Sequence, residues 1–246
     1  MQNRAPGLRK LARIALPVAV LAFVASLFMR YRLPDKSLAL EPLLQNPVQT
    51  KDEVPEPFEV TRKNVTYTVT PLFGYELWGM IVSYHHSASF IDISHKQWND
   101  YINTKDICVI WGQNVETGVY ERMTFRNRDF TCYYRYPDRE TGELFTENAL
   151  SNNHLLPADP LVAGAVLRAR TGDQVHFKGW LVSYGVKGAP YSRRSSTVRN
   201  DRGNGACEVV YITEFEVLQE ANAAWRMLHK FSLVLVALSL ATLIFV

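Results

Sequence analysis

The strongest constraint on this chain of 246 residues is a long apolar run at each end. The first run, Ile14–Met29, contains no charged residue and lies between Arg13 and Arg30. As a helix its 16 residues cover about 24 Å, so flanking residues must complete a hydrocarbon core of about 30 Å. The second run, Phe231–Val246, is equally long and equally free of charge. Each run predicts a transmembrane helix.

Each run also has an alternative interpretation. A basic tail followed by an apolar run is typical of a cleaved signal peptide, but the bulky Leu27–Arg30 lacks the small residues of a cleavage site and favours an uncleaved anchor. The alternative for the second run is a buried amphipathic helix. Its stretch Phe231–Leu238 continues without a polar face, which favours a lipid environment.

Basic residues stand on both sides of the predicted spans. The N-terminal tail carries four of them, and the first helix usually dominates orientation. We therefore expect a membrane protein with both termini in the cytoplasm and an extracytoplasmic central domain, in a bacterial inner membrane with the domain in the periplasm. Basic residues on the central side of the spans favour the opposite orientation, and these are Arg30, Arg32, Lys36, Arg226 and Lys230.

The chain between the predicted spans divides into a proline-rich segment and a folded domain. With 47% hydrophobic and 21% charged residues the composition is that of a globular protein, and a net charge of +3 is too small to indicate a nucleic-acid binder. Five prolines between residues 33 and 59 predict an extended stalk. The predicted divisions are 1–32 for the tail and first span, 33–59 for the stalk, 60–218 for the domain and 219–246 for the C-terminal helix.

The three cysteines, Cys108, Cys132 and Cys207, all lie in the middle region. In an oxidising compartment two of them would pair and leave one free. The alternative is that all three are small buried hydrophobic residues. The sequence leaves both interpretations open.

Alternating apolar and polar residues predict five strands in the domain. One helix is predicted over Leu161–Arg170, because Asp159 is a good N-cap and Pro160 suits the first helical position. Gly179 lies in the middle of the fourth strand, where a strongly bent strand needs a residue without Cβ. The predicted strands are 75–84, 107–111, 130–136, 174–184 and 208–217, with a short strand at 65–69 before them.

The order of three strands, one helix and two strands, together with the segment GDQVHFKGWLVSY, resembles the OB-fold. The resemblance covers about Thr68–Leu218. It implies a mainly β domain, a five-stranded Greek-key barrel with one packed α-helix. Two connections, 112–129 and 137–158, are longer than this fold needs, and a β-sandwich with a helical insert is the structural alternative.

The resemblance also implies where a ligand binds, because OB-folds use the face of strands two and three and the loops that join strands one to two and four to five. In this chain these loops are 85–106, which is rich in histidine, and 185–206, which is rich in arginine. We expect them to converge on one cleft. The candidate ligand-binding residues are His85, His86 and His95 in the first loop, Lys187, Tyr191, Arg193, Arg194, Arg199 and Arg202 in the second, and Trp111 and Trp180 on the strands.

These candidates have plainer explanations as well. Ser, Gly, Asn and Arg are the usual composition of an exposed loop, and strand aromatics also fill cores. No HExxH, CxxC, GxSxG, P-loop or GxGxxG motif is present, so we predict no catalytic residue, no metal site and no cofactor. His154, in the segment SNNHLLP, is placed in a polar turn before the helix.

Together these features predict a membrane-anchored extracytoplasmic module that binds protein partners or assists assembly in an envelope complex, without being an enzyme. One alternative is binding of single-stranded nucleic acid or another polyanion through the arginine-rich loop. A second alternative is a histidine-dependent metal- or haem-binding protein or hydrolase.

Overall fold

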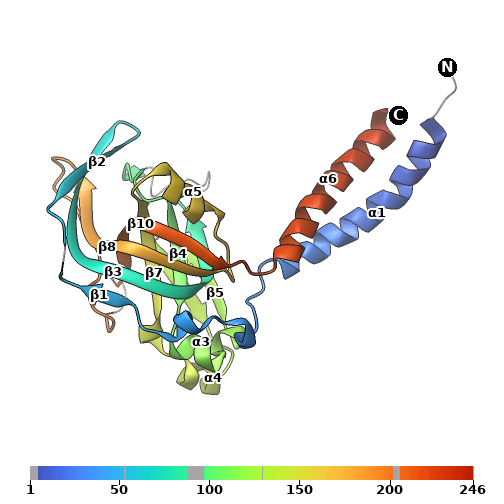
Figure 1. Ribbon diagram of the computed structural model, residues 1–246. Helices are drawn as coiled ribbons and strands as arrows, with labels where there is room; N and C mark the ends of the chain where they lie inside the picture. Colours follow the sequence, from blue (N-terminus) through green and yellow to red (C-terminus); the bar gives the residue numbers. More distant parts are fainter. Residues whose placement is uncertain (1–4, 53, 88–96, 129, 202–205, 246) are drawn as a thin grey trace. The chain divides into compact units, whose positions relative to one another are not determined.

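The computed structural model describes residues 5–52, 54–87, 97–128, 130–201 and 206–245. The chain forms two compact units (Figure 1). One unit combines Met1–Arg32 with Ala221–Val246, and the other is the central domain, Leu33–Glu220.

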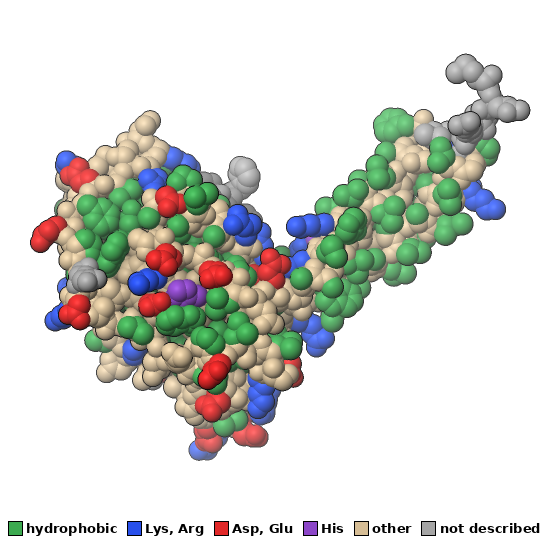
Figure 2. Space-filling view, in the orientation of Figure 1, with side chains coloured by type: hydrophobic (Ala, Val, Ile, Leu, Met, Phe, Trp, Pro, Cys, Tyr) green, Lys and Arg blue, Asp and Glu red, His purple; other side chains and the backbone are tan. Residues whose placement is uncertain are grey.

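The terminal unit is a pair of long helices, α1 (Ala5–Met29) and α6 (Ala223–Phe245). Both are long and apolar enough to cross a membrane. Each exceeds its charge-free run, because good helix formers continue the helix and bring its length to about 35 Å. Green hydrophobic side chains cover much of their surface in Figure 2. Few residues of α6 are buried, which disfavours the alternative of a core helix.

The two helices contact one another. The imidazole of His229 in α6 stacks on Phe23 of α1, with 4.7 Å between the ring centroids. Its Nδ1 also lies 3.0 Å from Oγ of Ser26. A hydrogen bond between helices fixes which faces meet where apolar side chains alone give little specificity.

The central domain is built on one large mixed sheet, which confirms the expectation of a mainly β domain. Most neighbouring strands run antiparallel, while β7 and β10 run parallel. A separate hairpin consists of β5 (Thr124–Arg128) and β6 (Thr131–Arg135). The strands of the large sheet are β1 (Val48–Thr50), β2 (Phe58–Arg62), β3 (Val65–His86), β4 (Lys105–Ile110), β7 (Leu150–Pro157), β8 (Gln174–Val186), β9 (Arg193–Arg194) and β10 (Glu208–Gln219).

Strand β3 holds this sheet together. Its first part pairs with β8 over Tyr67–Met80, and its last part pairs with β4 over Met80–His86. Register shifts between Pro71 and Phe73 and between Ile81 and Ser83 interrupt the ladders. Such irregularities bend a strand, which lets one continuous strand serve two neighbours.

One predicted strand is in the wrong place. The stretch 130–136 does form a strand, β6, but it pairs with β5 in the small hairpin. The position beside β4 belongs to β7, where the sequence predicted a polar turn. Nearly all of β7 is buried, including Asn152, Asn153 and His154. The polar residues of this segment predicted an exposed turn. They are buried because their side chains find hydrogen-bond partners inside the domain.

The predicted helix is confirmed as α5 (Pro160–Arg168). The Asp159 carboxylate accepts hydrogen bonds from the backbone N–H groups of Leu161 and Val162. At the other end, the buried Lys105 of β4 donates to the carbonyl oxygens of Val166 and Ala169. A cation at the C-terminal end of a helix compensates its exposed carbonyls, so this bond fixes α5 to the sheet.

The long connections contain further short helices that the sequence did not indicate. In α4 the Asp138 side chain accepts from the N–H of Thr141. The elements in these connections are α3 (Gln113–Thr117), α4 (Arg139–Leu144) and the 3-10 turns η3 (Val119–Arg122) and η4 (Glu147–Ala149). Two further 3-10 turns, η1 (Lys36–Leu38) and η2 (Glu41–Leu44), lie in the segment before β1.

The prediction of an extended stalk is wrong for residues 33–50, which pack into the central domain. Leu43 is completely buried, and β1 pairs with β3. The side chain of Gln174 accepts from the N–H of Leu40 and donates to the carbonyl oxygen of Leu38. The prolines start short turns here, while the leucines between them supply apolar surface to bury.

A disulfide between Cys108 of β4 and Cys132 of β6 ties the hairpin to the sheet. Cys207 is the free cysteine. The pairing that the sequence left open is therefore settled in the structure.

Removal of this bridge is expected to destabilise the domain. Its 24-residue separation closes a loop worth about 3 kcal/mol of unfolding free energy. The Cys108→Ala/Cys132→Ala variant, measured by denaturant unfolding of the full chain in detergent, should lose about that amount. Dithiothreitol should lower the unfolding free energy of the wild type and leave that of the variant unchanged. Equal stability of the oxidised and reduced wild type would contradict the presence of this disulfide.

The prediction for Gly179 concerns its close approach to β10. A Cβ on Gly179 would overlap the carbonyl oxygen of Tyr211, and backbone cannot move away as a side chain can. Gly179→Ala is expected to cost about 3 kcal/mol of unfolding free energy. The matched control, Gly164→Ala within α5, meets only the far end of Arg168 and should be neutral or stabilising. Equal unfolding midpoints for the two variants would refute this account.

Candidate functional site

The loop after β3 meets the loop after β8. The ring of Trp98 meets the ring of Tyr191 edge-on, with 5.4 Å between their centroids. The hydroxyl of Tyr184 donates to Oδ2 of Asp100 at 2.8 Å. Residues from both predicted loops therefore share one surface.

A pocket of about 310 Å³ opens where these loops meet, and we call it the mouth pocket. Its walls are mainly aromatic and apolar, with Asp100 and Arg193 as charged members. Trp98 and Tyr191 are more than half exposed, at 54% and 59%. The residues that line it include Tyr67, Trp98, Asp100, Tyr184, Tyr191 and Arg193.

The described histidines of the first loop lie elsewhere. His85 and His86 are the last residues of β3, paired with Asp106 and Lys105 of β4, and neither lines the mouth pocket. Burial lowers the pKa of His86 to about 4, with further lowering by the positive charges of Lys105 and Arg170, so this ring is neutral. His95 lies outside the described residues, as does Arg202 of the second loop.

Among the described basic residues of the second loop, two are already held in ion pairs and do not form an open cationic surface. Lys187 pairs with Glu59 at 2.7 Å, and Arg199 pairs with the buried Glu208. Arg194 is exposed on β9. Arg193 reaches the mouth pocket, with its guanidinium 4.0 Å from the ring centroid of Phe130.

The two candidate tryptophans do not join the mouth pocket. Trp111 is completely buried in the core, with the guanidinium of Arg199 lying 5.4 Å from its ring. Its side chain therefore has no exposed surface to offer a ligand in this structure. Trp180 is partly buried and stacks on Tyr211, where it packs against a second core cluster.

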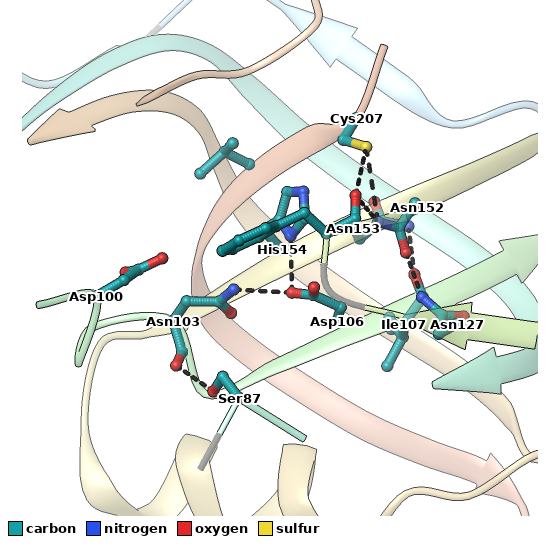
Figure 3. Close-up of polar contacts among 12 residues, drawn as sticks. Ser87, Asp100, Asn103, Asp106, Ile107, Asn127, Asn152, Asn153, His154 and Cys207 are labelled. Atoms are coloured by element: carbon teal, nitrogen blue, oxygen red, sulfur yellow. Dashed lines mark hydrogen bonds and ion pairs between the residues drawn. The ribbon is translucent and has the colours of Figure 1, made fainter. Parts of the chain in front are cut away.

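The sequence did not anticipate a buried ionic pair beside the loops. Nδ1 of His154 lies 2.7 Å from Oδ1 of Asp106, and both side chains are fully buried. The amide of Asn103 donates to the same carboxylate oxygen at 2.8 Å (Figure 3). Burial lowers the pKa of His154, but the charge of Asp106 and its hydrogen bond outweigh burial and raise the pKa to about 9.

The thiol of Cys207 lies next to this pair. In Figure 3 it is on the side of the His154 ring away from Asp106, and its interaction with the ring also raises the pKa of His154. Cys207 is partly exposed and lines a second cavity of about 840 Å³, which we call the thiol cavity. Tyr191 and Arg193 line both cavities, so the two are neighbours.

Only the sheet pairing brings these residues together. Asp106 and His154 are register partners on β4 and β7, and β7 pairs in parallel with β10, which begins immediately after Cys207. Three separated residues form no sequence motif, so pattern reading had no signal to find. Among the described residues, no group of three or more His, Cys, Asp or Glu side chains is arranged to hold a metal ion.

The chain matches no protein-family model, no curated protein and no solved structure.

The His154–Asp106 pair predicts a pH dependence of stability. An unfolded histidine has a pKa of about 6.5, so the raised native value stabilises the fold fully below about pH 6.5, and this contribution is lost as pH rises through 9. The unfolding free energy should fall by about 3 kcal/mol between these limits. His154→Gln should lack this component when both proteins are titrated by denaturant unfolding. Identical pH profiles would refute the charged pair.

Proposed function

We infer that this chain is a membrane-anchored binding module, whose OB-like domain takes a protein partner at the mouth pocket. The domain would lie outside the cytoplasm, with both termini inside. The observation that carries the proposal is a concave pocket flanked by two half-exposed aromatic side chains, Trp98 and Tyr191, beside one arginine. Trp, Tyr and Arg at a desolvated pocket are the residues that dominate binding energy in protein interfaces.

The strand pairings support an OB-like barrel. The ladders run from β3 to β4, β7, β10 and β8, and from β8 back to β3. The helix α5 follows the third of these strands in the chain, as in that fold. The loops that an OB-fold uses for ligands are then the two that meet at the mouth pocket.

The disulfide supports placement outside the cytoplasm, because such bonds persist in oxidising compartments. The two long apolar helices support anchoring in a membrane. The partner is inferred to offer an apolar side chain to the aromatic walls, with an acidic or carbonyl group beside Arg193. Polyanion binding has less support, because Lys187 and Arg199 are already engaged in ion pairs.

The test compares the Trp98→Ala/Tyr191→Ala variant with wild type in a native detergent extract. We expect wild type to migrate as a complex and the double variant as the isolated chain, since loss of two aromatic anchors costs at least about 2 kcal/mol, or thirtyfold in affinity. Leu161→Ala, on the highly exposed first turn of α5, is the control and should keep the complex. Wild type that migrates alone would refute the proposal, and strong salt dependence of the complex would favour a polyanion instead.

A further inference from the structure

We propose that Cys207 is a thiol nucleophile, with His154 as its general base and Asp106 as the residue that positions the base, and that it acts on acyl carbonyl groups admitted to the thiol cavity. The inference does not depend on partner binding at the mouth pocket. It rests on the side-chain arrangement around a cavity large enough for a substrate.

The first supporting observation is the arrangement itself. A carboxylate holds Nδ1 of an imidazole at 2.7 Å, and a thiol lies on the other side of the ring (Figure 3). This is the order of groups that activates a nucleophile in unrelated folds, where the third residue fixes the tautomer and orientation of the base.

The second observation is an unsatisfied nitrogen. Nε2 of His154 is fully buried and makes no hydrogen bond of ordinary length to the part of the chain that the structure describes. A structural histidine in a core normally satisfies both ring nitrogens, because an unpaired buried group is costly. Here the free nitrogen is on the side of the ring that faces Cys207.

The thiol itself is held by weak contacts. Sγ of Cys207 lies 3.4 Å from the carbonyl oxygen of Phe130, and Nδ2 of Asn152 donates to Sγ at 3.6 Å. When the proton leaves, the contact to the carbonyl loses its donor. Neither contact is a strong hydrogen bond, and the amide of Asn152 can still donate to the sulfur after its proton has moved to another acceptor.

Charged groups surround this site on several elements. Asp106 faces His154 from β4 and raises the pKa of its imidazole. The positive charge of Arg193 on β9 lowers that pKa. On the cavity side, Arg193 and Arg194 are balanced by Asp201 and Glu147. The positive charge of the arginines would stabilise a negative oxygen that develops on a reacting carbonyl.

The reaction balances without a cofactor. In the proposed reaction the proton of the Cys207 thiol passes to Nε2 of His154 before sulfur attacks the carbonyl carbon. The bond from that carbon to the leaving oxygen, nitrogen or sulfur then breaks, and the leaving group takes the proton from His154. Water next attacks the thioester and gives its proton to His154, which returns it to sulfur as the carboxylic acid departs.

The first experiment measures alkylation of Cys207 by iodoacetamide in the full chain in detergent, read by mass spectrometry of peptides. At about pH 6 the rate should exceed that of glutathione at least tenfold, because the imidazolium keeps the sulfur ionised. A rate that follows the pH profile of a free thiol would overturn the proposal.

Variants connect this reactivity to the two buried residues. His154→Gln should return the rate to that of a free thiol, and Asp106→Asn should shift the pH profile in the same direction. The double variant His154→Gln/Asp106→Asn removes both charges of the buried pair together. It therefore tests the role of His154 without leaving one unpaired charge in the interior. The control is His176→Gln. It breaks another histidine–carboxylate pair, between His176 and Glu76 at 2.8 Å, in which no cysteine takes part. Wild-type reactivity in the folded double variant would overturn the role of His154.

The second experiment tests the acyl step with 4-nitrophenyl acetate. We expect an acetyl group on Cys207 in acid-quenched protein and release of more than one nitrophenolate per chain, both lost in Cys207→Ser. Equal release by that variant would overturn the proposal. Recovery of Cys207 in a disulfide with Cys132, which lines the same cavity, would also overturn it and indicate thiol–disulfide exchange instead.

Discussion

The arrangement of the domain depends on a buried strand that carries polar side chains. Strand β7 lies between β4 and β10, with Asn152, Asn153 and His154 removed from water. Such a strand is tolerable only if its polar groups are paired internally. Asp106 supplies the partner for His154, and Asn127 donates to Asn152 at 2.6 Å. The same requirement that keeps β7 in place therefore assembles the acid and base beside Cys207.

Much of the fold follows from local sequence. The terminal helices, the Asp159-capped helix and strands β4, β8 and β10 were predicted because each has a clear apolar period or a capping signal. The wrong predictions share one physical cause. Segments with polar residues or prolines were expected to be exposed to solvent, but they are buried. The polar letters of β7 suggested a turn, and the prolines of 33–50 suggested a stalk, yet both segments are buried through partners distant in sequence.

The candidate site shows the same limit more sharply. Sequence reasoning found the two loops, and they do meet through Trp98 and Tyr191. It could not predict the ion pairs of Lys187 with Glu59 and of Arg199 with Glu208. Neither pair has a spacing in the sequence that indicates a contact. Nor could it join Asp106, His154 and Cys207, which become neighbours only when β4, β7 and β10 take their register.

The side-by-side packing of α1 with α6 has a consequence for turnover of the protein in a bilayer. A domain held by one tail is shed by a single cleavage in its linker. Here a protease that cuts next to either helix leaves the domain attached through the other, and the interhelical contacts of His229 hold the severed helix as well. If both helices span a bilayer, release of the domain into the surrounding medium would require two independent cuts.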